Sequence, residues 1–285
     1  MQKIGLALSG GGAKGFAHIG FLKGLEANGL YPDIITGTSM GGVVGGLYAY
    51  GIAPQTMERF VATMQLNDFL KTAGPATPAV DVRKSRLFRY VQWAGVGLRV
   101  LFTNKAFDSG DKIRSFLAHV TRGADFSLLR LPFACIALDI LSGNKITFSQ
   151  GPLADALYAT MALMPFLEPL RYQGMALVDG GAVDNIPVET ARELGATRVV
   201  GVYVGQQQPA KREKYRTSLD VVRRVNEITT KASDNLQLCR SDLAISMDVR
   251  ADMFDFDKGE EAMRQGEQAA LQNIDRLRSL WEMPA

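Results

Sequence analysis

Ser39 lies in a five-residue pattern that is typical of serine hydrolases. The pattern is Gly-x-Ser-x-Gly, with Gly37 and Gly41 on either side of the serine. A β-branched run precedes it at residues 34–36, and a run that can form a helix follows at residues 43–50. This order predicts a strand, a tight turn and a helix with Ser39 at the apex, which is the arrangement of a nucleophile elbow. An ordinary glycine–serine loop has the same five-letter pattern, so that alternative stays open at this point.

A serine nucleophile needs a group that accepts its proton, and histidine, the usual acceptor, is scarce in this chain. The sequence contains two histidines, His18 and His119. Neither lies late in the chain after an acid, as the ordinary order of an α/β-hydrolase triad requires. His119 lies inside a predicted helix at 111–121, and His18 follows a glycine-rich loop. We expect both histidines to be structural, and we expect His18 to form a hydrogen bond near that loop.

The carboxylate of Asp179 is the best-placed alternative base. Asp179 follows a predicted strand at residues 175–178 and precedes Gly180 and Gly181. Because the carboxyl ends of parallel strands meet at one edge of a sheet, we expect Asp179 and Ser39 to open onto the same side. A carboxylate within hydrogen-bond reach can act as a general base, and partial burial would raise its pKa toward that use. The alternative is an aspartate that caps a turn.

A glycine run near the N-terminus can supply hydrogen-bond donors. Gly10, Gly11 and Gly12 lie between the first predicted strand and the first predicted helix. Their N–H groups, next to a helix N-terminus, can point at the negative charge that develops during acyl transfer. Lys14 adds a positive charge close by. This loop therefore predicts an oxyanion hole.

The same run, continued to Gly15, also fits the dinucleotide-binding pattern Gly-x-Gly-x-x-Gly. That pattern requires an acid at the end of the second strand. Here Asp33 precedes the second strand, and the strand ends in the pattern around Ser39. A phosphate loop of the G-x-x-x-x-G-K-[ST] type is also absent from the sequence. We therefore expect no nucleotide binding.

The composition is that of an ordinary globular protein. The chain has 285 residues, of which 47% are hydrophobic and 21% charged, and its net charge of +3 is far from that of a nucleic-acid-binding protein. Cys135 and Cys239 form no metal-binding or disulfide framework, which favours a reducing compartment. No apolar run approaches the ~18 residues of a membrane span, and the N-terminus lacks the apolar core of a signal peptide. We therefore expect a cytoplasmic protein, with peripheral contact at the inner membrane surface as an option.

Hydrophobic periodicity predicts strands that alternate with helices. Predicted strands cover residues 4–9, 34–36, 131–141, 145–149, 175–178, 198–204 and 243–249. Predicted helices cover residues 16–29, 43–50, 52–72, 111–121, 152–164, 187–194, 218–238 and 259–281. The opening order of strand, helix, strand and helix implies a parallel α/β sheet covered on both faces. We predict a single domain over residues 1–285 with a cap-like or lid-like insertion at about 74–110, and we expect Asp139 and Asp184 to be structural.

A basic, aromatic-containing segment lies within this insertion, at residues 83–105. Its apolar residues and arginines could form a lid or an interfacial surface that touches acidic lipid. A cap helix packed on the core, with solvated arginines, explains the same residues equally well.

Three motifs in this order resemble those of the patatin-like phospholipase family. They are GGGAKG at residues 10–15, GTSMG at 37–41 and DGG at 179–181. The neighbouring runs at 16–20 and 183–188 also look like those of the compact bacterial members. The resemblance covers roughly residues 3–205, and the C-terminal helix more loosely.

The resemblance implies a three-layer α/β/α sandwich with a mostly parallel central sheet and a Ser–Asp dyad without histidine. It implies no metal and no cofactor, and a substrate that is a fatty-acyl ester of a phospholipid or lysophospholipid. The implied site residues are the dyad Ser39 and Asp179, the oxyanion hole of Gly10, Gly11 and Gly12, and the supporting residues Lys14, Gly37, Gly41 and Gly180.

The sequence departs from the family pattern at two places. Lys14 stands where the family often has arginine, so the positive charge is kept but fork-like bonding is lost. Thr160 stands where the family tends to have serine, and the proline that follows, Pro165, is offset by one residue. We expect the second change to affect the shape of the local pocket and the acyl preference rather than the chemistry.

These observations predict a serine esterase that acts on lipid acyl chains through an acyl-enzyme. Two alternatives stay open. One is an acyltransferase on the same dyad, in which a lipid or thiol replaces water. The other is a lipid-binding or signalling module whose site is catalytically weak.

Overall fold

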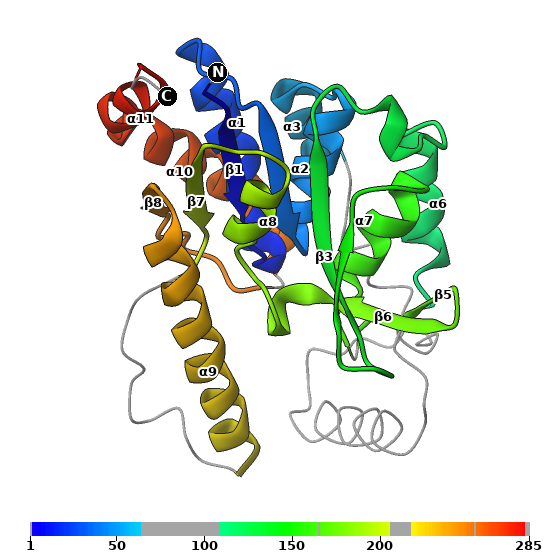
Figure 1. Ribbon diagram of the computed structural model, residues 1–285. Coiled ribbons are helices and arrows are strands. Elements are labelled where there is room, and N and C mark those ends of the chain that lie inside the picture. The colour runs from blue at the N-terminus through cyan, green and yellow to red at the C-terminus, as the bar shows by residue number, and fades with distance from the viewer. Residues whose placement is uncertain (1, 64–108, 165, 206–217, 254, 283–285) are drawn as a thin grey trace, which may run out of the picture.

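The computed structural model describes residues 2–63, 109–164, 166–205, 218–253 and 255–282, and its centre is a sheet with helices on both faces (Figure 1). The strands are β1 (Ile4–Leu8), β2 (Ile34–Thr38), β3 (Phe133–Asp139), β4 (Lys145–Phe148), β5 (Leu170–Tyr172), β6 (Met175–Asp179), β7 (Arg198–Tyr203) and β8 (Leu243–Ser246). Their order in the sheet is β5-β6-β3-β2-β1-β7-β8, and β4 pairs with β3 outside this path.

The helices lie between and after these strands. They are α1 (Ala17–Ala27), α2 (Met40–Tyr50), α3 (Pro54–Thr63), α6 (Asp111–Val120), α7 (Leu153–Met161), α8 (Val188–Glu193), α9 (Ser218–Arg240), α10 (Gly259–Gln272) and α11 (Ile274–Glu282). Short 3-10 turns are η1 (Gly12–Phe16), η3 (Phe126–Leu128), η4 (Gly180–Ala182) and η6 (Phe256–Lys258).

The parallel part of the sheet is built around β1. This strand pairs in parallel with β2 on one side and β7 on the other, and β2–β3 and β7–β8 continue the parallel pairing. All five residues of β1 and all five of β2 are buried, as expected for parallel strands that are covered on both faces. The predicted α/β fold with a mostly parallel sheet is confirmed.

The remaining strands run in the opposite sense. Both β4 and β6 pair with β3 in antiparallel fashion, and β5 pairs antiparallel with β6. The hairpin of β3 and β4 agrees with the predicted strands at 131–141 and 145–149. The sequence prediction omits β5, which has only three residues.

Side chains of the sheet and of its helices pack together in two apolar cores. Successive residues of β1 alternate between them, since Leu6 and Leu8 belong to the larger core and Ala7 to the smaller. Helices α1, α2, α7 and α10 contribute to the larger core, and α8 and the C-terminal end of α9 contribute to the smaller one. The layers are therefore helix, sheet and helix, as predicted (Figure 1).

The C-terminal helical region differs from its prediction. The sequence predicts one helix over residues 259–281, but the structure has two, α10 and α11, which are separated at Asn273. The Asn273 side chain donates to the Ala269 carbonyl at 2.9 Å, and its backbone N–H donates to the Ala270 carbonyl at 3.2 Å. These two bonds complete the C-terminal turn of α10 and allow the chain to change direction.

Parts of the chain lie outside the described residues. The predicted insertion at about 74–110 falls there except for its last two positions, and the basic segment at 83–105 falls there entirely. Both stay predictions, as does the single domain over 1–285. Among the described helices, none has both the length and the apolar character that crossing a membrane requires.

Candidate active site

Ser39 lies at the turn between β2 and α2, as the sequence predicts. Its backbone has φ 55° and ψ −129°, a conformation that L-residues other than glycine rarely adopt. A Cβ at Gly41 would meet the carbonyl oxygens of Leu8 and Ser9, and one at Gly37 would meet the backbone of Gly41. The two glycines therefore allow the elbow to close against the end of β1, which favours a nucleophile elbow over an ordinary loop.

A threonine hydroxyl holds the elbow from the neighbouring helix. Thr160, on α7, is completely buried, and its hydroxyl accepts a hydrogen bond from the Ser39 N–H at 2.9 Å. The same hydroxyl donates to the Ile136 carbonyl on β3 at 2.6 Å. The departure from the family pattern at this position therefore falls on a residue that contacts the elbow directly.

Asp179 lies beside Ser39, close enough for the Ser39 side chain to lower the pKa of its carboxyl. One carboxylate oxygen, Oδ1, also accepts the N–H of Gly181 at 2.8 Å, so Asp179 caps the short turn η4 as well. Burial raises the pKa of Asp179 to about 6, although the hydrogen bonds from Ser39 and Gly181 act in the opposite direction. The turn-capping alternative and the contact with the serine are thus both present in one side chain.

The reason that we gave for this juxtaposition is wrong. Strand β6 is antiparallel to β3, so it runs toward the amino edge of the parallel strands and does not end at their carboxyl edge by parallel alignment. Instead, β3 extends past β2, and β6 returns along it until Asp179 lies opposite Ala137. Ile136, the preceding residue of β3, is paired with Thr38, so the returning strand brings Asp179 to the level of Ser39.

The glycine loop faces the same turn. A Cβ built on Gly10 would lie 3.0 Å from the Cβ of Ser39. The Gly10 N–H is already engaged, since it donates to the side-chain oxygen of Asn185 at 3.0 Å and to the Asn185 backbone carbonyl at 3.3 Å. Within the described part of the chain, the N–H groups of Gly11 and Gly12 donate no hydrogen bond. These two N–H groups are therefore not used by the described part of the chain.

The supporting residues occupy different surroundings. A Cβ on Gly180 would meet the backbone of Ile136, so the close approach of η4 to β3 requires a glycine there. Lys14 lies in η1 and is partly exposed. Its position follows the glycine loop directly, but no contact in the structure joins its ammonium group to Ser39 or Asp179.

His18 is buried against the glycine loop and does not contact the serine. Its Nε2 donates to the Ser9 carbonyl at 2.8 Å, and burial lowers its pKa to about 4, so the ring is neutral. The predicted structural hydrogen bond near the loop is confirmed. His119 is exposed on α6, which agrees with its expected place on a helix surface.

The two other aspartates near the site have structural partners, as expected. Asp184 is buried, forms an ion pair with Lys145 at 3.0 Å, and its backbone carbonyl accepts the Thr38 hydroxyl at 2.7 Å. Asp139 accepts hydrogen bonds from the side chain of Ser142 and from the backbone N–H of Ala176 in β6.

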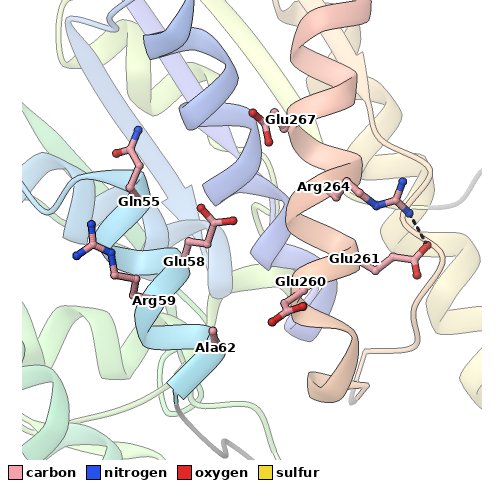
Figure 2. A pocket seen from close by; sticks show the side chains of 8 residues that line it. All are labelled: Gln55, Glu58, Arg59, Ala62, Glu260, Glu261, Arg264 and Glu267. Atoms are coloured by element: carbon pink, nitrogen blue, oxygen red, sulfur yellow. Dashed lines mark hydrogen bonds and ion pairs between the residues drawn. The ribbon is translucent and has the colours of Figure 1, made fainter.

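A separate pocket lies between α3 and α10 (Figure 2). It has a volume of about 770 Å³, and its lining is mostly charged, with glutamates from both helices and two arginines. No residue of the predicted site lines it. The pocket in Figure 2 is therefore separate from the site around Ser39. No group of three or more metal-ligating side chains occurs among the described residues.

A comparison with protein-family models identifies the chain. The model described as patatin-like phospholipase matches residues 6–192, which include the glycine loop, the Ser39 elbow and Asp179. The chain belongs to this family. Membership in the patatin-like phospholipases supports hydrolysis of lipid esters as the general class of activity.

Curated relatives carry related names. Patatin-like phospholipase domain-containing protein 6 of Homo sapiens is 31% identical over 220 residues, which is 76% of this chain and 14% of that protein. Lysophospholipase NTE1 of Cryptococcus neoformans is 33% identical over 204 residues, which is 72% of this chain and 11% of that protein. The match therefore spans only a small part of the length of these relatives.

A solved structure shows the same fold. VipD from Legionella pneumophila aligns with a TM-score of 0.55 and 13% sequence identity, covering 97% of this chain and 67% of that one. At this identity the likeness concerns the fold of this patatin-like phospholipase and not its substrate.

Proposed function

We propose that this chain hydrolyses fatty-acyl esters of phospholipids or lysophospholipids through a dyad of Ser39 and Asp179. The observation that carries the proposal is the place of Asp179 beside the Ser39 side chain, whose influence lowers the pKa of the carboxyl, at a strained elbow beside the glycine loop. The family supports lipid ester hydrolysis in general. The dyad and the phospholipid or lysophospholipid substrate are our finer assignment.

Asp179 is the general base in this mechanism. Its carboxylate accepts the Ser39 hydroxyl proton while Ser39 Oγ forms a bond to the ester carbonyl carbon. A pKa of about 6 leaves the carboxylate ionised at neutral pH and makes it a stronger base than an exposed aspartate would be. The second bond, from the Gly181 N–H, holds the carboxylate in place while it takes the proton.

The glycine loop stabilises the negative charge that forms on the carbonyl oxygen. The N–H groups of Gly11 and Gly12 are the donors, because the Gly10 N–H is occupied by Asn185. Removing one oxyanion donor typically lowers kcat by about 10²–10³, so this loop accounts for a large share of the rate. Lys14, partly exposed in η1, adds a positive charge directly after the glycine loop.

Two further steps complete the cycle. The tetrahedral intermediate collapses by breaking the bond to the alcohol, which leaves with the proton that Asp179 received. A water molecule then gives a proton to Asp179 and attacks the acyl carbon. The bond to Ser39 Oγ breaks to release the fatty acid, and Ser39 Oγ takes the proton back from Asp179. An acyltransferase would differ only in this last step, where a lipid hydroxyl or a thiol would replace water.

The substrate class rests on the names of the relatives. One relative that is 33% identical over 204 residues is a lysophospholipase. We infer that a single-chain phospholipid, whose ester is more accessible than that of a packed bilayer lipid, is also a substrate here.

A lipid panel tests this proposal. Wild type, Ser39→Ala and Asp179→Asn are assayed on phospholipids and lysophospholipids with differing head groups, and released fatty acid is measured. Ser127→Ala is a matched control, because Ser127 is exposed and far along the chain from the elbow. We expect hydrolysis by wild type and Ser127→Ala alone. Full hydrolysis by Ser39→Ala would refute the proposal.

Two additions separate the alternatives. Adding acyl acceptors to the same reactions tests for transfer, since a transferase would form new acyl esters at the expense of free fatty acid. A fluorophosphonate probe tests whether Ser39 is nucleophilic at all. A folded wild-type protein that neither reacts with the probe nor hydrolyses any lipid would be a binding module.

A further inference from the structure

The glycine loop is tied to a carboxylate on the opposite layer of the molecule. Asn185 joins them, because its Oδ1 accepts the Gly10 N–H at 3.0 Å and its Nδ2 donates to Asp234 Oδ1 at 3.1 Å. Gly10 is in the loop after β1, Asn185 follows η4, and Asp234 is on α9. Three segments that are distant in sequence therefore meet beside Ser39.

Asp234 sets the orientation of the Asn185 amide. An aspartate carboxylate only accepts hydrogen bonds, so it requires the NH₂ end of the amide to face it. The carbonyl end of the amide must then face the Gly10 N–H. With the amide reversed, an NH₂ group would oppose that N–H and an oxygen would oppose the carboxylate, which leaves both pairs unsatisfied.

Asp234 is itself held in place. Asp234 is 3% exposed and lies beside the Tyr203 side chain at the end of β7, which lowers the pKa of its carboxyl. Asp184 faces it from the segment before Asn185, and burial together with this neighbouring charge raises the pKa of Asp234 to about 6. Burying a carboxylate costs free energy, so its retention at this place is consistent with a specific task.

The loop has independent supports on its other side. The Ser9 hydroxyl donates to the Gly10 carbonyl at 3.0 Å and accepts the Val204 N–H at 3.1 Å, and His18 donates to the Ser9 carbonyl. These bonds fix the start of the loop. Asn185 fixes the preceding peptide, between Ser9 and Gly10, because its side-chain Oδ1 and its backbone carbonyl both accept the Gly10 N–H, at 3.0 Å and 3.3 Å.

We propose that Asp234 is a positioning residue of the active site, which acts through Asn185 on the Gly10 peptide and so orients the N–H groups of Gly11 and Gly12. This inference rests on the proposed function, since it assigns a second layer of residues to the same oxyanion loop. Asp234 does not contact substrate. We expect its effect on kcat, because a misdirected N–H group stabilises the transition state less, while binding of the substrate changes little.

The first test compares variants that keep or remove the acceptor. Asp234→Leu removes the acceptor for Asn185, and we expect kcat to fall about 10- to 100-fold while KM changes less than about twofold. Asp234→Asn keeps an oxygen acceptor without the charge, and we expect it to retain activity within about fivefold. Asp242→Asn is the control, since Asp242 forms ion pairs with Arg192 and Arg198 where β7 and β8 begin, at the opposite ends of the strands from the elbow.

A double-mutant cycle tests the route of the effect. Asn185→Ala should lower kcat about as much as Asp234→Leu, and the double variant should be no worse than Asn185→Ala alone. Additive losses would show that Asp234 does not act through Asn185 and would overturn the proposal.

The pH profile separates the two buried aspartates. Both Asp179 and Asp234 have a pKa raised to about 6. Around Asp234 the facing groups are Tyr203 and Asp184, with Lys231 and Gln237 as neighbours on α9 itself. In Asp234→Asn we expect the acid limb of kcat/KM to stay near pH 6, because Asp179 is still present. Loss of that limb would overturn a positioning role for Asp234.

Hydrogen exchange provides a readout that does not need activity. In Asp234→Leu and Asn185→Ala, backbone amides of the peptide covering residues 9–14 should exchange at least about tenfold faster than in wild type or Asp242→Asn. Lower kcat with unchanged exchange would overturn the proposal, and so would faster exchange with unchanged kcat. If wild type neither hydrolyses lipid nor reacts with a fluorophosphonate, the proposed function fails, while the exchange data still test the link to Asn185.

Discussion

Replacing Asp179 with asparagine should make the protein more stable and almost inactive. The substitution keeps the size of the side chain and an oxygen that can accept the Gly181 N–H. It removes the ionisable group that lies partly buried beside Ser39. A base in a protein interior carries a cost for stability, and this variant measures that cost.

The magnitude follows from the pKa. The carboxyl of Asp179 has a pKa of about 6 in the folded protein, raised from 3.8 by burial. Each pH unit of difference is worth about 1.4 kcal/mol, so keeping the carboxylate ionised in the fold costs about 3 kcal/mol at pH 7.5. The neutral amide also gives up part of the charge-assisted hydrogen bonding from Ser39 and Gly181, so we expect a net gain of about 1–3 kcal/mol.

The sign of the pH dependence is fixed by the direction of the shift. A folded-state pKa above the unfolded one means that Asp179 favours the fold fully below pH 3.8, and that this benefit is lost as pH rises through about 6. The asparagine variant should therefore gain most on wild type at pH 7.5, and the gain should shrink between pH 6 and pH 4. Urea unfolding at several pH values measures it, and thermal melting should shift by about 2–4 °C for each kcal/mol.

Asp242→Asn is the matched control for this experiment. The backbone N–H of Val199 and the guanidinium groups of Arg198 and Arg192 lower the pKa of Asp242 despite its partial burial. Its contribution to stability is present at neutral pH and is lost as pH falls, so this variant should lose stability at pH 7.5. If Asp179→Asn gives no gain at pH 7.5, or a gain that is the same at every pH, then burial does not raise the pKa of Asp179 and the argument is wrong.

Three other variants or conditions test the elbow and its base. Activity on a water-soluble ester should fall about tenfold per pH unit below about pH 6, as Asp179 becomes protonated, and a profile that stays flat to pH 4.5 would contradict its role as the base. Thr160→Val leaves the Ser39 N–H without its acceptor and should lower both kcat and the free energy of unfolding, the latter by about 1–3 kcal/mol. Thr160→Ser keeps the hydroxyl and should retain both values. Equal losses in the two variants would show that the methyl group matters instead of the hydroxyl. Gly41→Ala should prevent accumulation of folded protein, because its Cβ would meet backbone, while Gly201→Ala, with its nearest contact at 3.1 Å, should fold; circular dichroism and solubility compare them.

The parallel strands and the elbow could be predicted because their signals are local. Short apolar runs bounded by glycine gave β1 and β2 nearly to the residue, and the helix after Ser39 followed from the next run. The shortage of histidine pointed to a carboxylate, and the structure brings Asp179 to the serine. The strand and helix inferences use residues within one element, and the histidine count uses the composition of the whole chain.

The sense of β6 could not be read from β6 itself, because a strand has the same alternation in either direction. A signal was present in the preceding turn. Gln173 and Gly174 both have positive φ, at 49° and 81°, which is the geometry of a two-residue hairpin turn. A hairpin there implies a short strand before β6, and this would have revealed both β5 and an antiparallel edge of the sheet.

The residues that hold the site in place had no local signal. Thr160 is 121 residues from Ser39, and Asn185 is 175 residues from Gly10. A buried threonine in a helix and an asparagine after a turn are common, and their partners are set only by how the layers pack. Sequence patterns thus found the groups that we propose to react, while the groups that contact them required the fold.

Two carboxylates in this site have nearly the same pKa, and their contacts give them different tasks. Asp179 and Asp234 are both raised to about 6, chiefly by burial. Asp179 lies beside the Ser39 side chain, and in the proposed mechanism its charge is used when the proton moves. Asp234 touches an amide that in turn holds a peptide group, so its oxygen matters more than its charge. Neutralising each with asparagine should therefore abolish turnover at one position and spare most of it at the other, although both substitutions remove the same buried charge.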